Sequence, residues 1–106
     1  SDMLYAIMLI AKNGEPYNFI STGVNGNYKE EILTNAKEVV KSREIYLFHT
    51  KDNGKVFSAI PIITDPGTND ESVIGVLNIS ATIEDKDFIK DISNILSITI
   101  KGAIKI

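Results

Sequence analysis

The first residues alternate between apolar and polar blocks in a pattern that predicts two strands joined by a tight turn. Residues 4–12 (LYAIMLIAK) are apolar on both faces, as is typical of a strand inside a sheet. Asn13 and Gly14 follow, and this pair supplies the positive φ angles that a hairpin turn needs. Residues 17–24 (YNFISTGV) have the composition of a second strand. The sequence therefore predicts a β-hairpin at the start of the chain.

A helix is predicted after this hairpin. Apolar residues in 28–42 recur three and four positions apart with charged residues between them, which indicates an amphipathic helix. Asn27 is the candidate N-cap, and Glu30 stands three positions later, as in a capping box. We therefore expect the helix to begin immediately after Asn27.

Three further strands are predicted in the second half of the chain, over residues 44–50, 55–64 and 72–81. Each is rich in β-branched and aromatic residues, and a second Asn-Gly turn joins the first two. Pro61 cannot donate a hydrogen bond to a neighbouring strand. Its strand should therefore lie at an edge of the sheet or carry a bulge at that point.

The last segment, residues 84–106, is compatible with two kinds of element. Apolar residues recur at helical spacing throughout, yet residues 95–101 alternate and are rich in β-branched side chains. The length favours a helix. One predicted apolar stripe comprises Phe88, Ile92, Ile95, Leu96, Thr99, Ala103 and Ile106, and a second comprises Ile89, Ile100 and Ile104. A helix that is apolar on two sides should be buried by its own sheet and by a partner.

The predicted order of elements is β-β-α-β-β-β-α. Two hairpins make the sheet largely antiparallel, so we expect the α+β class, with a central, mostly antiparallel five-stranded sheet flanked by helices. Residues 1–3 have the composition of an expression scar, and residues 4–106 are expected to form a single domain.

Composition excludes several functions. The chain has 106 residues, a net charge of −3 and 43% hydrophobic residues, which suits one small hydrophobic core. The acidic balance argues against a nucleic-acid partner. The longest apolar run, residues 4–11, is too short to span a membrane and lacks the basic flank of a signal peptide, so we expect a cytoplasmic domain without membrane contact. The absence of cysteine excludes iron–sulfur clusters, thiolate nucleophiles and covalently attached bilins.

Three segments in the second half of the chain resemble the GAF domain, a small-molecule-sensing module of signalling proteins. Residues 58–62 (SAIPI) resemble the family's strand of a small residue, an apolar residue, proline and an apolar residue. Residues 71–80 (ESVIGVLNIS) resemble its Gly-Val-Leu strand, and residues 87–106 resemble its closing helix. The resemblance implies a GAF/PAS-like fold, with a PAS or profilin-like sheet domain as the structural alternative. The chain departs from the family in starting almost directly on its first strand, as a domain lacking its N-terminal helix.

The resemblance also implies a function. It suggests a regulatory sensor domain of a bacterial signal-transduction protein, such as the sensor histidine kinase of a two-component system. Such a domain binds a small ligand or cofactor non-covalently and relays the signal through its C-terminal helix to a covalently linked output domain. The alternative is a ligand-free dimerisation or interaction module in the same kind of protein. We expect a homodimer formed through the terminal helix, no catalytic activity in the domain itself, and a cofactor whose identity the sequence leaves open.

A small-ligand pocket is usually apolar with a few convergent polar groups. The side chains expected to line it combine both kinds; they are Thr22, Tyr28, His49, Phe57, Ser58, Asn78 and Ser80. Core packing explains most of these residues equally well. His49, the only histidine, is a weak haem candidate, although a strand-end histidine bonded to a nearby loop is the simpler interpretation. No nucleophile–base pair and no metal-ligand set is discernible.

Overall fold

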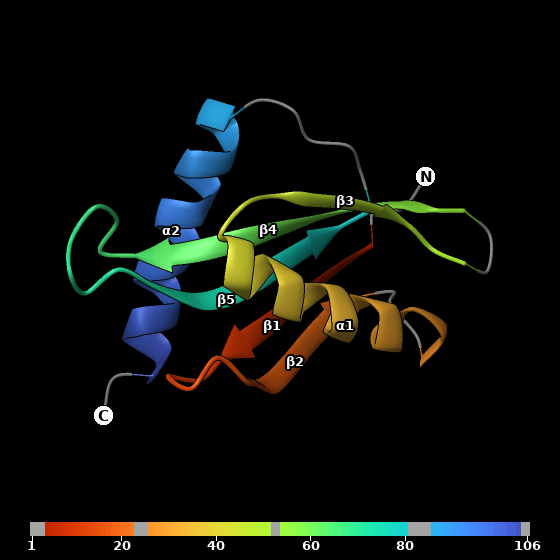
Figure 1. Ribbon diagram of the computed structural model, residues 1–106, viewed down its shortest axis with the longest axis horizontal. Helices are drawn as coiled ribbons and strands as arrows, with labels where there is room; N and C mark the ends of the chain where they lie inside the picture. Colours follow the sequence, from red (N-terminus) through yellow and green to blue (C-terminus); the bar gives the residue numbers. More distant parts are fainter. Residues whose placement is uncertain (1–3, 23–25, 52–53, 81–85, 105–106) are drawn as a thin grey trace.

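An antiparallel five-stranded sheet and two helices form an α+β arrangement, as the sequence predicts (Figure 1). The computed structural model describes residues 4–22, 26–51, 54–80 and 86–104. The elements follow one another as β1 (Tyr5–Ile10), β2 (Pro16–Thr22), α1 (Gly26–Ser42), β3 (Tyr46–His49), β4 (Val56–Thr64), β5 (Ser72–Ile79) and α2 (Lys86–Ile104). The predicted expression scar at residues 1–3 lies outside the described residues.

The strands are arranged in the order β2-β1-β5-β4-β3, and every neighbouring pair is antiparallel. The first and last strands of the chain, β1 and β5, therefore pair in the middle of the sheet. In Figure 1, α1 lies on the near side and runs roughly along the strands, while α2 lies on the far side and crosses them. Each face of the sheet is thus covered by one helix. Among the described residues, neither helix is long and apolar enough to cross a membrane.

The face beneath α1 is formed by alternate residues of the central strands, since successive side chains of a strand point to opposite faces. Its buried cluster combines alanines and aromatic rings with aliphatic side chains. The members are Ala6, Met8, Ile10, Tyr28, Ile32, Ala36, Val39, Phe48, Phe57, Ala59, Val73 and Val76. Tyr28, Ile32, Ala36 and Val39 recur on one side of α1, which explains why this segment is helical and how it is oriented.

The face beneath α2 is formed by the intervening residues of the same strands. Its buried cluster is entirely aliphatic, comprising Leu9, Ile60, Ile62, Leu77, Ile79 and Ile100. The half-buried side chains of Ile92 and Leu96 extend this cluster along α2. These contacts place 86–104 as a helix against the sheet, and the alternative of a strand over 95–101 is wrong.

Gly75 of β5 faces α2 at a point with little free space. A Cβ atom at this position would lie 3.1 Å from Cδ1 of Ile62, 3.3 Å from the backbone oxygen of Met8 and 3.4 Å from Cδ1 of Ile100. The glycine of the Gly-Val-Leu motif is therefore explained by packing, because any larger residue would push against a neighbouring strand and against α2.

Pro61 meets the predicted condition for a proline in a sheet. It pairs with Val76 of β5, while β3 pairs with β4 only over residues 56–59, so β4 is locally an edge at Pro61. A register shift between Ile62 and Ile63 follows immediately. The missing N–H of the proline therefore falls where no strand requires it.

Two finer predictions are wrong. Helix α1 begins at Gly26, so Asn27 lies inside the helix and cannot be its N-cap. The predicted division of α2 also fails, because Ile95 is 64% exposed whereas Ile100, assigned to the other stripe, is buried. Both stripes repeat with the helical period, so the hydrophobic pattern could not decide which one meets the sheet.

Candidate functional site

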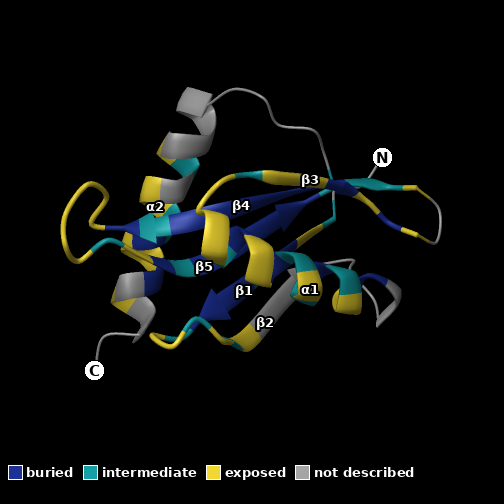
Figure 2. Ribbon diagram, in the orientation of Figure 1, coloured by how far each residue is buried: buried dark blue, intermediate teal, exposed yellow. Residues whose placement is uncertain are grey.

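Three of the predicted site residues, Tyr28, Phe57 and Asn78, lie on the α1 face of the sheet. The rings of Tyr28 and Phe57 are 5.7 Å apart at an angle of 49°, and both side chains are buried. Asn78 is fully buried in the middle of the sheet, in register with Ala6 of β1 and Ala59 of β4. Figure 2 shows this central part of the sheet as its most buried region.

The remaining predicted residues lie elsewhere. Ser58 alternates with Phe57 and Ala59, so its buried side chain faces α2. The backbone N–H of Leu4 donates to Oγ of Ser80 at 2.8 Å, and the N–H of Ser80 donates to the carbonyl of Leu4 at 2.9 Å. Ser80 therefore fastens the start of the chain to the end of β5. The side chain of Thr22 lies outside the described residues.

His49 is exposed at the end of the short edge strand β3, where it pairs with Val56. An exposed position offers no apolar enclosure for a haem group. Among the described residues, no three His, Cys, Asp or Glu side chains gather closely enough to hold a metal ion. The candidate site therefore depends on the residues around Asn78.

The amide group of Asn78 is poorly satisfied. Its Nδ2 atom lies 3.5 Å from the carbonyl oxygen of Ala6 and 3.4 Å from that of Val76. Both distances exceed the usual upper limit of about 3.2 Å. Its Oδ1 atom is buried and has no hydrogen-bond partner within the described part of the chain. A buried acceptor left in this state costs about 1–3 kcal/mol.

Aromatic rings form a continuous row on the same face. Phe48 stacks on Phe57 with ring centroids 5.5 Å apart, and Tyr46 stacks on Phe48 at 6.1 Å. Together with Tyr28, these rings run from the exposed edge of β3 to the buried N-terminal half of α1. The α1 face therefore offers apolar ring surfaces and one hydrogen-bond acceptor, all beneath a helix that would have to move to admit a ligand.

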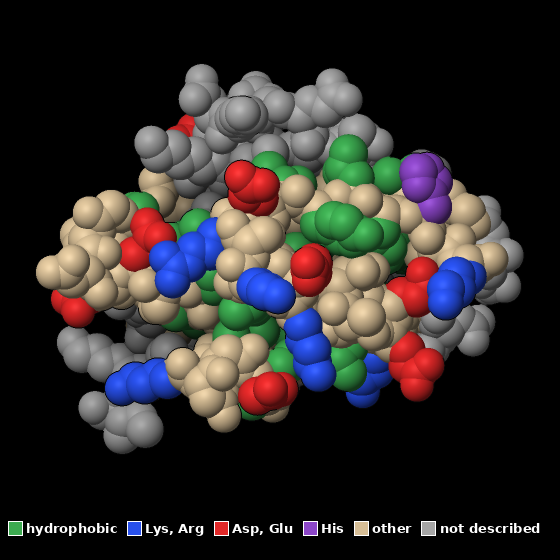
Figure 3. Space-filling view, viewed as in Figure 1, with side chains coloured by type: hydrophobic (Ala, Val, Ile, Leu, Met, Phe, Trp, Pro, Cys, Tyr) green, Lys and Arg blue, Asp and Glu red, His purple; other side chains and the backbone are tan. Residues whose placement is uncertain are grey.

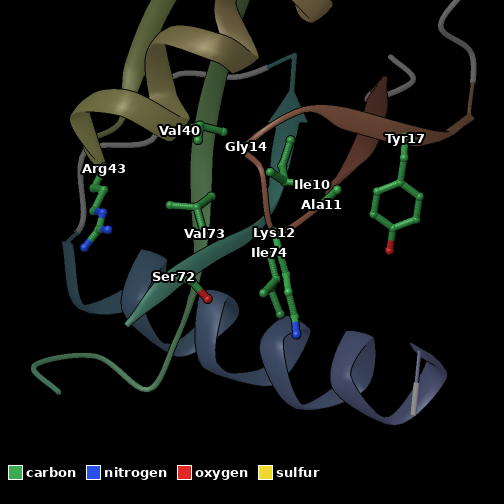
Figure 4. A pocket seen from close by; sticks show the side chains of 10 residues that line it. All are labelled: Ile10, Ala11, Lys12, Gly14, Tyr17, Val40, Arg43, Ser72, Val73 and Ile74. Atoms are coloured by element: carbon green, nitrogen blue, oxygen red, sulfur yellow. The ribbon is translucent and has the colours of Figure 1, made fainter. Parts of the chain in front are cut away.

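A surface hollow lies at the opposite end of the strands, where the β1–β2 hairpin meets the end of α1 and the start of β5. It encloses about 530 Å³, and Figure 4 shows its lining residues, which are Ile10, Ala11, Lys12, Gly14, Tyr17, Val40, Arg43, Ser72, Val73 and Ile74. We call it the hairpin hollow. Figure 3 shows this end of the near face hollowed, with apolar side chains inside and basic side chains at the rim.

The sequence interpretation missed this hollow because no local motif marks it. Its walls come from separate segments that become neighbours only when β1 and β5 pair. The only signal was the Asn13-Gly14 turn, which places Lys12 at a hairpin tip.

One wall of the hairpin hollow is held by an ion pair between Arg43 and Glu71. Arg43 ends α1 in the left-handed region, with a φ of 61°, and its N–H donates to the carbonyl of Val39 at 2.7 Å. Glu71 also accepts the N–H of Gly67 at 2.8 Å. That backbone hydrogen bond, and then the Arg43 guanidinium, lower the pKa of Glu71 below its ordinary value of 4.5. The charge of Arg43 is therefore already paired with a carboxylate of the same chain.

Comparison of the chain with protein-family models, with curated proteins and with solved structures found no match.

Proposed function

We propose that this chain is a GAF/PAS-like regulatory sensor domain that binds a small ligand non-covalently on the α1 face of its sheet. The observation that carries the proposal is the fully buried Oδ1 atom of Asn78, which has no partner among the described residues. Core packing alone would be better served by an aliphatic side chain at this position. A ligand that donates an N–H or O–H to Oδ1 would remove the cost.

The surroundings of Asn78 define what such a ligand needs. Ala6 and Ala59 flank it with the smallest buried side chains of the face, and Tyr28 and Phe57 supply ring surfaces. A small molecule with one donor group and a flat apolar part fits this chemistry. Because α1 covers the face, the ligand selects an arrangement in which the N-terminal half of α1 is raised.

The same strands provide a route to α2. Leu77 and Ile79 flank Asn78 in β5, point to the opposite face and belong to the aliphatic cluster that holds α2. A shift of β5 on ligand binding therefore changes the packing of α2, through which we propose that the signal leaves the domain. The output domain would be covalently linked, as in a sensor histidine kinase, and we propose no catalytic role for the sensor domain itself.

A screen of polar small molecules by thermal shift, followed by native mass spectrometry, tests the proposal. We expect at least one compound to bind wild type and to lose its stabilising effect in Asn78→Leu. Thr64→Val provides a matched control, since Thr64 is another buried polar residue, at the far end of β4. Equal binding to all three proteins, or no binding compound in a broad screen, would contradict the proposal.

The outer side of α2 supports the second candidate function, a dimerisation or interaction module. Ile95 and Ile98 are 64% and 74% exposed, and they lie on the same side of the helix. Exposed isoleucines one turn apart are suited to pack against the same helix of a second copy. Light scattering across a dilution series tests this function. We expect a dimer that Ile98→Glu converts to a monomer, whereas a wild-type monomer at every concentration would rule the module out.

A further inference from the structure

We infer that the hairpin hollow is a second binding site, and that it takes a monocarboxylate with an apolar body, such as a medium-chain fatty acid. It is separate from the site proposed at Asn78. Ile10 in the hollow lies four residues along β1 from Ala6, the neighbour of Asn78, which corresponds to about 13 Å along a strand. The inference goes beyond the proposed sensor function and does not depend on it.

The aliphatic side chains inside the hairpin hollow indicate that its ligand has an apolar part. Ile10 and Val73 are buried on the α1 side of the hollow beside the half-buried Val40, and the half-buried Ile74 lines its α2 side. The volume of about 530 Å³ lies within the range of about 300–1,000 Å³ usual for small-molecule sites. A hydrocarbon chain bound here would release the water in contact with these aliphatic side chains.

The basic side chains at the rim of the hairpin hollow indicate that the ligand carries a negative charge. Of the two basic residues there, Arg43 is paired with Glu71 and sits at the C-terminal end of α1, where the helix dipole disfavours an anion. Lys12 is exposed at the hairpin tip and has no ion-pair partner within the described residues. Lys12 is therefore the cation available to a bound anion.

The hydroxyl of Ser72 completes the head-group site. Figure 4 shows the side chains of Lys12 and Ser72 pointing to the same side, toward α2, below the apolar side chains of Val40 and Val73. One ammonium group and one hydroxyl match the single charge and two oxygens of a carboxylate. A doubly charged phosphate would need a second free cation, which Arg43 does not provide while it is bound to Glu71.

Titration of the ¹⁵N-labelled protein with octanoate, followed by NMR, tests the inference. We expect saturable shifts of the amides of Ile10, Lys12, Val73 and Ile74. Octan-1-ol, which has the same chain without the charge, should bind about fivefold more weakly, as expected for loss of one exposed ion pair. Lys12→Gln should weaken octanoate binding by the same factor, whereas Lys37→Gln, at an exposed position on α1, should leave it unchanged.

Three results would overturn the inference. They are the absence of saturable shifts at about 10 mM octanoate, shifts confined to residues outside the hollow, and equal binding of octanoate and octan-1-ol by wild type and Lys12→Gln. Asn78→Leu should retain octanoate binding. Failure at the hollow would therefore leave the proposed function untouched, and failure of the Asn78 test would leave the hollow untouched.

Discussion

The two faces of the sheet are built from neighbouring residues of the same strands, yet they differ in chemistry. The α2 face buries only leucine and isoleucine in its cluster, around a glycine that lets the helix approach. The α1 face buries aromatic rings and alanines, with the asparagine Asn78 among them. The aliphatic cluster accounts for the packing of α2 on the sheet, although the buried side chain of Ser58 also faces α2. On the α1 face, Oδ1 of Asn78 is buried without a hydrogen-bond partner among the described residues.

If the domain acts as the sensor that we propose, this difference would separate two roles. A closely packed aliphatic face transmits displacement, because interiors packed at this density have low compressibility. A face with an unsatisfied buried acceptor bears a cost of about 1–3 kcal/mol that a hydrogen-bond donor on a ligand would remove.

The aromatic row on the α1 face should contribute most to stability where it is buried. Phe57 is completely buried between Tyr28 and Phe48, so Phe57→Ala should lower the free energy of unfolding by about 3–5 kcal/mol. Tyr46→Ala, at the exposed end of the row, should cost about 1 kcal/mol. Urea denaturation measures both. Similar losses for the two variants would show that the buried rings do not hold this face together.

The close approach on the α2 face is tested by Gly75→Ala. The added methyl group would press on the backbone oxygen of Met8, which cannot yield as a side chain can, so we expect a loss of about 1–3 kcal/mol. Gly102→Ala is the matched control within α2. No atom lies within 4 Å of a Cβ placed there, and helix propensity alone should raise stability by about 0.5–1 kcal/mol. Opposite signs for the two substitutions are the expected result, and equal effects would contradict the packing described.

Because the amide of Asn78 on the α1 face is unsatisfied, we expect its replacement to raise the stability of the protein, whereas most substitutions in a core lower it. Asn78→Leu should stabilise the ligand-free protein by about 1 kcal/mol, since it removes an unpartnered acceptor and only two long hydrogen bonds. Thermal unfolding of ligand-free wild type and variant measures this. Destabilisation by more than about 1 kcal/mol would mean that the amide is already well satisfied.

The smallest effect concerns Glu71, outside both faces. Because its folded-state pKa is lowered below 4.5, its contribution to stability is present above that pH and is lost as the pH falls through the lower folded value. Glu71→Gln should therefore flatten the decline of stability below about pH 4.5. Arg43→Gln should flatten it less, since the Gly67 hydrogen bond remains. Unfolding curves between pH 7 and pH 3 measure this, and identical profiles for wild type and Glu71→Gln would contradict it.

Features that depend on local sequence pattern could be predicted. The hydrophobic period predicts the five strands and the helix that contains Tyr28. The Asn-Gly turns predict both hairpins, and the missing N–H of proline predicts the constraint at Pro61. The sequence could not predict which side of α2 packs against the sheet. Ile95 and Ile100 have the same hydrophobicity, and only contact with the sheet distinguishes them.

Contacts between distant segments set the rest of the candidate site. The pairing of β1 with β5 places Asn78 between Ala6 and Ala59, and no pattern within either strand encodes that register. The same pairing builds the hairpin hollow, which Lys12 and Ser72 both line. Side-chain type alone predicts His49 and Ser58 in one site with Asn78, but strand alternation places their side chains on the opposite face of the sheet.

A ligand site at Asn78 can be tested by hydrogen exchange and mass spectrometry, with the compound from the thermal-shift screen added to wild type and to Asn78→Leu. We expect this compound to change exchange in α1 over residues 26–33 and in α2 of wild type, and in neither helix of Asn78→Leu. Identical changes in both proteins, or changes confined to the hairpin hollow, would contradict a ligand site at Asn78.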